Sequence, residues 1–243
     1  MRLAAFASRN RKEILRDPLN IAFGVGFPLV LLFLLSAIQA NVPVSLFEIE
    51  QLTPGIAVFG LSFISLFSGM LIAKDRSSSF LTRLFASPLS ASDYILGYAL
   101  PLLPIAIMQS AICFLAAFFL GLAINVKILV TLMVLIPTAI LYMGFGLLAG
   151  SLFNDKQVGG ICGALLTNLS AWLSGTWFDL NLVGGAFEKV AELLPFVHAV
   201  DAAKAAISGE YSSVFPHLLW VIGYGVVIFT LAVVAFRKKM KGK

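Results

Sequence analysis

Charged residues are scarce in this sequence, and their scarcity excludes an ordinary soluble domain. Of its 243 residues, 12% are charged and 60% are hydrophobic. Soluble domains carry roughly 25% charged residues and about 45–50% apolar residues. Most of the surface of this chain is therefore expected to face lipid rather than water.

Motifs for nucleotide, metal and nucleophile chemistry are absent as well. No GxxxxGK[ST] sequence occurs, so the chain has no P-loop with which to bind nucleotide phosphates. No HExxH occurs either, and an exposed acidic helix face explains the set Glu188, Glu192, His198 and Asp201 more simply than a metal site does. The two cysteines both fall in apolar runs, which leaves no disulfide framework or zinc pattern. We therefore expect no enzymatic activity, no cofactor and no metal in this chain.

Six stretches of the sequence contain no charged residue. Each is longer than the ~20 residues that a helix needs to cross a hydrocarbon core about 30 Å thick. Their apolar residues are continuous rather than alternating, which predicts helices and not the strands of a barrel. The first run is also too long for the apolar part of a signal peptide. The expected fold is all-α integral membrane, one domain over residues 1–243, with six transmembrane helices at 19–39, 53–73, 94–120, 128–152, 158–177 and 214–236.

Basic residues set the expected orientation. With the N-terminus inside, only Lys127, Lys189 and Lys204 of the 17 Lys and Arg residues lie on the outer side. Basic residues in short loops stay on the cytoplasmic side, so we predict a multi-pass protein of the plasma membrane, of bacterial inner-membrane type, with both ends cytoplasmic. The formal charge of +5 then lies at the inner face, where it favours anionic lipid over nucleic acid as a partner.

Three segments outside the spans have helical periodicity. Residues 1–17 mix basic and apolar side chains, which predicts an interfacial helix on the inner surface, with a solvated basic tail as the alternative. Residues 75–90 predict a helix in the longest inner loop, and Ser90 is placed to cap the helix that opens the third span. Residues 179–210 predict short outer helices split by Pro195. The apolar stripe of the inner helix consists of Phe80, Leu81, Leu84 and Phe85.

Two glycine pairs have the spacing of a close helix contact. Gly146 and Gly150 form one GxxxG sequence, and Gly159 and Gly163 form another. Such pairs let helix backbones approach closely in a membrane. The spacing is compatible both with helix packing inside the chain and with a dimer contact, and the sequence leaves these alternatives open.

The inner loop resembles the cytoplasmic loop of type-2 ATP-binding cassette (ABC) exporter permeases. In that family the loop has an acid and a base, then roughly Gly-Thr-Leu-Glu-Arg-Leu, then Ala-Thr-Pro-Leu-Ser. In this chain Ser79 and Phe80 replace Gly-Thr, and Thr82 replaces Glu. The order of spans, inner loop and outer insert is similar too. The matching residues are Asp75, Arg76, Leu81, Arg83, Leu84 and the run Ala86-Ser87-Pro88-Leu89-Ser90.

The resemblance implies that the chain is one membrane half of an exporter. A separate cytoplasmic ABC ATPase would bind ATP and Mg²⁺, and residues 75–90 would be the coupling helix that inserts into it. A second copy of the chain or a sister permease would complete the membrane unit. The residues expected to contact the ATPase are Asp75, Arg76, Phe80, Arg83, Leu84 and Pro88, of which Phe80 and Leu84 are our inference from the apolar stripe.

The spans also bear on the substrate. A route without charged side chains favours an amphiphilic substrate, such as a drug, a peptide antibiotic or a lipid-like molecule, moved outward. An ion-coupled carrier or channel is the alternative, and Gln109, Asn168 and the Pro101–Pro104 kink are the features that support it. A non-transporting scaffold subunit is a further alternative.

Overall fold

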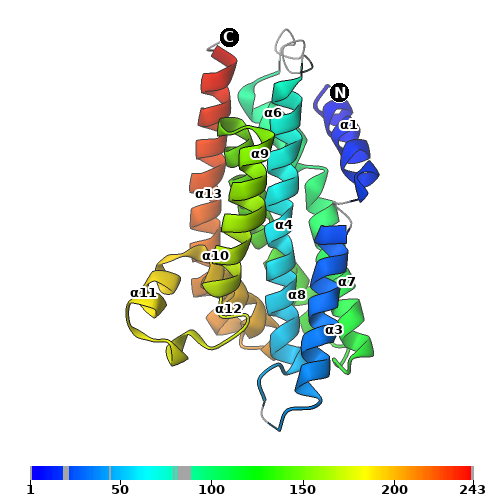
Figure 1. Ribbon diagram of the computed structural model, residues 1–243, viewed down its shortest axis with the longest axis vertical. Coiled ribbons are helices and arrows are strands. Elements are labelled where there is room, and N and C mark those ends of the chain that lie inside the picture. Colours follow the sequence, from blue (N-terminus) through cyan, green and yellow to red (C-terminus); the bar gives the residue numbers. More distant parts are fainter. Residues whose placement is uncertain (1, 19–21, 44, 79, 81–88, 242–243) are drawn as a thin grey trace.

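The chain is a bundle of long helices. The computed structural model describes residues 2–18, 22–43, 45–78, 80 and 89–241, and every regular element in these residues is a helix. The expected all-α fold is thereby confirmed. Both ends of the chain lie at the same end of the bundle (Figure 1).

Five helical segments among the described residues are long and apolar enough to cross a membrane. They correspond to the first, second, third, fourth and sixth predicted spans. The third is interrupted at Pro101, where the proline removes a backbone hydrogen bond. The segments are η1 (Ala22–Gly26) with α3 (Phe27–Gln39), α4 (Ile49–Ser77), α6 (Ala91–Ala99) with α7 (Leu102–Phe119), α8 (Val126–Leu152) and α13 (Tyr211–Lys241).

The span predicted at residues 158–177 is helical but less regular than the others. Helix α9 (Asp155–Val158), the π-helix η2 (Gly159–Leu166) and α10 (Thr167–Trp172) follow one another without a break. The helix ends before the predicted boundary because the chain turns near Gly175, whose φ of +69° is favourable for glycine alone. This segment packs against α4 (Figure 1). A sixth membrane crossing at this place remains a prediction.

Helix α4 is the centre of the bundle. Its most apolar window is 89% buried, against 17% for α13. Glycines make this burial possible, since a Cβ atom on Gly146 or Gly150 of α8 would overlap the backbone of α4 at Ser65 or Gly69. The Ser68 hydroxyl, in the same contact, donates a hydrogen bond to the Met143 carbonyl at 3.2 Å. Gly146 and Gly150 therefore serve packing inside the chain.

The second glycine pair is used differently. A Cβ on Gly163 would meet Leu66 at 3.3 Å, whereas a Cβ on Gly159 or the neighbouring Gly160 would have no heavy atom within 4 Å. This part of η2 is open among the described residues, so a dimer contact at Gly159 stays a prediction.

The N-terminal segment forms α1 (Arg2–Arg16), as predicted. Its apolar face packs against α6, where the ring of Phe6 lies edge-on to Tyr94 at 5.7 Å and to Tyr98 at 4.9 Å. The buried Asn10 amide donates to the Gly97 carbonyl at 3.0 Å. Helix α1 is therefore docked on protein, while Arg11, Lys12 and Arg16, together with Glu13 and Leu15, are exposed.

Residues 179–210, which the sequence predicts as an outer insert, contain the expected short helices. A 3₁₀ turn η3 (Leu180–Leu182) is followed by α11 (Gly185–Leu193) and α12 (Pro195–Ser208), with Pro195 at the first position of α12. Helix α12 packs against α4, α8 and α13 (Figure 1). Its small, fully buried residues are Ala199, Val200, Ala202, Ala203 and Ala206.

The boundary predicted for the inner helix at residue 75 is wrong. Helix α4 continues through Ser77, so Asp75 and Arg76 belong to the end of the second span and not to a separate loop helix. The continuation follows from the hydrogen bonds that still satisfy the backbone, with the Ser78 amide bonded to the Lys74 carbonyl at 3.2 Å. The expected cap at Ser90 is confirmed, because its side chain accepts from the backbone of Asp93 at the start of α6.

The α4–α8 contact can be tested with two matched glycine replacements. Gly146→Ala forces a methyl group against the backbone of α4, and overpacking of this kind lowers stability by about 1–3 kcal/mol. We expect the apparent Tm of the purified protein in mild detergent to fall by roughly 5 °C. Gly160→Ala places its methyl group in open space and should leave the Tm unchanged or raise it slightly. Equal Tm values for the two variants would contradict the contact.

Candidate functional site

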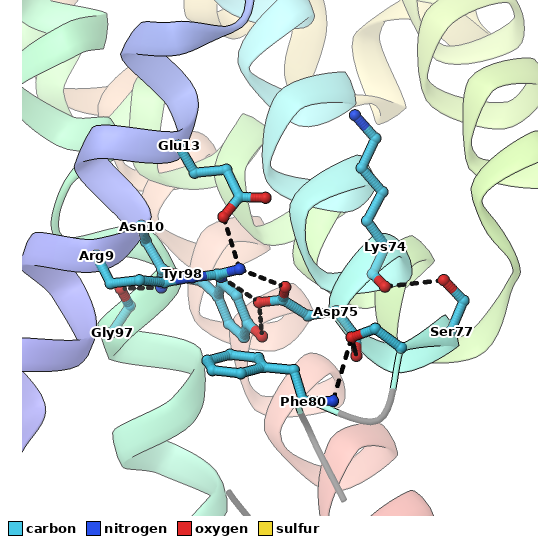
Figure 2. A network of polar contacts seen from close by, with 10 residues as sticks. Arg9, Asn10, Glu13, Lys74, Asp75, Ser77, Phe80, Gly97 and Tyr98 are labelled. Carbon is cyan, nitrogen blue, oxygen red and sulfur yellow. Dashed lines mark hydrogen bonds and ion pairs between the residues drawn. The ribbon is translucent and has the colours of Figure 1, made fainter. Parts of the chain in front are cut away.

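A cluster of polar residues joins three helices at the end of the bundle that carries both chain termini. We call it the Arg9 cluster; its members are Arg9 and Glu13 of α1, Asp75 of α4, Tyr98 of α6, and Phe80 of the loop (Figure 2). Arg9 donates two hydrogen bonds to Asp75, with Nη1–Oδ2 at 2.6 Å and Nη2–Oδ1 at 2.9 Å. This paired geometry is the strongest that an arginine and a carboxylate can form.

Both oxygens of the Asp75 carboxylate, at the centre of the cluster, accept hydrogen bonds. The side chain of Asp75 is 4% exposed, and it also accepts a hydrogen bond from the Tyr98 hydroxyl at 2.9 Å. Burial by itself lowers the pKa of Arg9, but the hydrogen bonds and charge of Asp75 outweigh burial and raise that pKa above its ordinary value. A buried charge that keeps these partners is tolerated, whereas one that loses them is strongly destabilising.

The Arg9 cluster also holds the beginning of the inner loop. The Ser78 hydroxyl donates to the Asp75 carbonyl at 2.9 Å and accepts from the Phe80 amide at 3.3 Å. These bonds bring the ring of Phe80 under the Arg9 guanidinium, 4.4 Å from its carbon to the ring centroid. Stacking of this kind is a favourable cation–π contact. The first residues of the loop are thus tied to α1 and α4 together (Figure 2).

Arg76 points to a different neighbour. Its guanidinium donates to the carbonyls of Gly150 at 2.6 Å and Phe153 at 3.1 Å, at the end of α8. Helix ends leave such carbonyls without partners in the helix, and a basic side chain satisfies them. Asp75 therefore holds α4 to α1 and α6, while Arg76 holds α4 to α8.

The residues that the sequence predicts to contact an ATPase have different surroundings in the structure. Asp75 and Arg76 both have partners within the chain, and a direct contact with an ATPase stays a prediction. Phe80 lies at the surface of the Arg9 cluster, half-buried. Arg83, Leu84 and Pro88 lie outside the described residues.

The sequence did not indicate the partners of Asp75. Arg9 and Glu13 stand four residues apart, a spacing that predicts a salt bridge along a helix, and the two charges are indeed 2.6 Å apart. That spacing does not say which surface the pair faces. Tyr98 has no local signal at all, since a tyrosine near the end of a span is ordinary at a membrane interface.

Comparison with known proteins decides the family. Residues 1–208 match the family model described as ABC-2 type transporter. The chain belongs to this family. The resemblance found in the inner loop is thereby confirmed.

Two curated proteins are similar to part of this ABC-2 family chain. It is 30% identical over 145 residues to "Putative transport permease ycf38" of Porphyra purpurea, covering 56% of this chain and 50% of the relative. It is 30% identical over 125 residues to the protein of the same name from Pyropia yezoensis, covering 49% of this chain and 43% of that protein. The chain thus spans about half the length of the relatives that it matches.

The Arg9–Asp75 pair predicts that replacing Arg9 lowers the stability of the protein strongly and that replacing Arg11 has little effect. Arg9→Gln leaves the buried Asp75 carboxylate without its ion-pair partner, which costs roughly 3–5 kcal/mol. Arg11→Gln makes the same change on the exposed side of the same helix and should shift stability by less than about 0.5 kcal/mol. Thermal unfolding and limited proteolysis of α1 measure both variants. If they behave alike, the pair does not hold α1 in place.

Proposed function

We propose that this ABC-2 family chain is the membrane-spanning half of an ATP-driven exporter. In this proposal it lies in a bacterial inner membrane with both termini cytoplasmic and couples to a separate ATPase through the loop between α4 and α6. A second copy or a sister permease completes the membrane unit. The observation that supports the proposal best is the Arg9 cluster, because it connects the beginning of that loop to α1, α4 and α6 at once.

The cluster suggests how motion of an ATPase would reach the membrane. A force on the loop acts on Phe80, and the Arg9 guanidinium lies directly against that ring. Asp75 passes the displacement to α4, the most buried of the long helices. Because α4 also packs against α3, α7, α8 and η2, a shift of α4 requires its neighbours to move with it. Packed interiors rearrange between discrete states rather than deform continuously.

ATP and Mg²⁺ belong to the partner in this proposal. The chain itself lacks a P-loop sequence. Its own contribution is a route for an amphiphilic substrate, which is consistent with long helices that carry no charge in their centres. The most exposed long helices, η1 with α3 and α13, have apolar windows that are only 17% buried, so they remain available for lipid or for a second permease.

An ion-coupled carrier is the second candidate, and one observation favours it. Gln109 of α7 is 1% exposed, and neither atom of its amide has a hydrogen-bond partner in the part of the chain that the structure describes. Polar groups inside a membrane are costly and often mark an ion or substrate route. A single neutral amide is nevertheless a weak ion site. A non-transporting scaffold would need neither this amide nor an ATPase.

Co-purification distinguishes these functions. The tagged chain is isolated from its native membrane in mild detergent in three forms, the wild type, Arg83→Glu and Lys156→Glu. Proteins bound to each form are identified by mass spectrometry, and the ATP hydrolysis of each sample is measured. We expect a P-loop ATPase to co-purify with the wild type and to be lost with Arg83→Glu, because this variant reverses one positive charge of the loop motif. Lys156→Glu reverses a positive charge in another inner segment and should retain the ATPase. Absence of an ATPase from all three samples would favour the carrier or the scaffold.

A further inference from the structure

A cavity of about 540 Å³ lies at the end of the bundle opposite the Arg9 cluster. Its walls come from α11, α12, the first turns of α13, residues 175–181 and residues 46–52, which lie together in the lower part of Figure 1. The volume is within the range of about 300–1,000 Å³ that is typical of small-molecule sites.

One wall of the cavity is aromatic. Phe47, Trp177 and Phe178 line it. The Trp177 ring lies edge-on to Phe59 of α4 at 5.4 Å, and the Phe178 ring contacts Phe187 of α11 at 6.3 Å. These contacts hold the rings in place, so the wall is a preformed apolar surface at the rim of the bundle.

The polar lining consists mainly of hydrogen-bond acceptors. No hydrogen bond or ion pair is made by the carboxylates of Glu188, Glu192 or Asp201 within the described residues, while Asp179 accepts from its neighbour Asn181. The one lysine in the lining, Lys204, is directed at the Gly175 carbonyl, with its Nζ at 3.1 Å. Four carboxylates in the lining, those of Asp179, Glu188, Glu192 and Asp201, therefore face a single lysine, which leaves the cavity with an excess of negative charge.

Asp201 is the carboxylate that burial affects most. Burial raises its pKa, and the nearby His217, Lys204 and His198 only partly oppose this effect. A carboxylate removed from water without a hydrogen-bond donor or a paired cation is unfavourable. A ligand that brings a positive N–H group would supply both.

The two histidines of the cavity lining are hydrogen-bonded to each other. Nε2 of His198 lies 2.8 Å from the Glu192 carbonyl, which can only accept, so Nε2 carries the proton. Burial lowers the pKa of His198 and keeps the ring neutral at pH 7. Its Nδ1 is then an acceptor, and His217 Nδ1, at 2.9 Å, must be the donor. Both ring nitrogens of His198 are thus occupied within the chain, and neither donates to a carboxylate of the cavity.

We propose that this cavity binds an amphiphilic molecule carrying a primary ammonium group. The ammonium lies at Asp201, and the apolar part of the molecule lies on Trp177 and Phe178. A primary ammonium has three donors and no acceptor, which complements a lining rich in carboxylates. An aromatic wall adds both apolar contact and cation–π attraction. This inference rests on the proposed function in one respect, namely that the bound molecule is the exported substrate.

Dansylcadaverine tests the site, because it joins an aromatic fluorophore to a primary amine. The purified chain in phosphatidylcholine nanodiscs is titrated with it, and dye uptake by protein-free nanodiscs is subtracted. We expect saturable binding to the wild type and about tenfold or more weaker binding to Asp201→Asn, which loses a charged hydrogen bond. Glu210→Gln, a matched change outside the cavity lining, should bind like the wild type. Dansylamide, the same fluorophore without the amine, should bind weakly to all three.

The control measurements make the result decisive. Asp201→Asn removes a carboxylate that makes no hydrogen bond within the described residues, so the Tm of this variant should stay at or above that of the wild type. Weaker binding by the variant then cannot be attributed to unfolding. Glu188→Gln provides a second variant in the same lining and should also weaken binding. Equal affinity of wild type and Asp201→Asn, or equal affinity for dansylamide and dansylcadaverine, would overturn the site. No ATPase is present in this assay, so its outcome is separate from that of the co-purification experiment.

Discussion

The arrangement of the bundle depends on the close approach of α4 and α8 at three glycines. Gly69 of α4 faces Gly146 and Gly150 of α8, and a Cβ atom on either glycine of α8 would overlap the backbone of α4. This approach brings Arg76 within reach of the last carbonyls of α8. Asp75, the adjacent residue, is then turned toward α1 and α6, where Arg9 and Tyr98 meet it. The close approach of these two backbones thus orients the charges at the end of α4.

The two ends of the molecule differ in how their charges are satisfied. At one end the Asp75 carboxylate accepts hydrogen bonds from the guanidinium of Arg9 and the hydroxyl of Tyr98, so both of its oxygens have partners within the chain. At the other end Glu188, Glu192 and Asp201 surround a cavity without such partners among the described residues. The first arrangement suits a joint that transmits force, since a paired buried charge resists separation. The second suits a site that receives a positively charged molecule.

Several features could be predicted from particular residues. Long runs without charge located five helices that are able to cross a membrane, and Pro195 marked the division between α11 and α12. Ser90 capped α6 as its type and position predicted. The inner loop carried the family resemblance, which the match over residues 1–208 confirmed. The start of the inner helix was misplaced, because the local sequence around Asp75 does not show that the span helix continues to Ser77.

The sequence by itself determined the class of fold, the order of the helices and the family, because these follow from hydrophobic runs, breaks and short motifs along the chain. Tertiary structure alone decided which of two glycine pairs packs inside the chain, that Asp75 pairs with Arg9, and that His198 and His217 share a cavity with Asp201. The reason is physical. Arg9 and Asp75 are 66 residues apart, and a contact over such a distance depends on how helices pack, which local periodicity does not record.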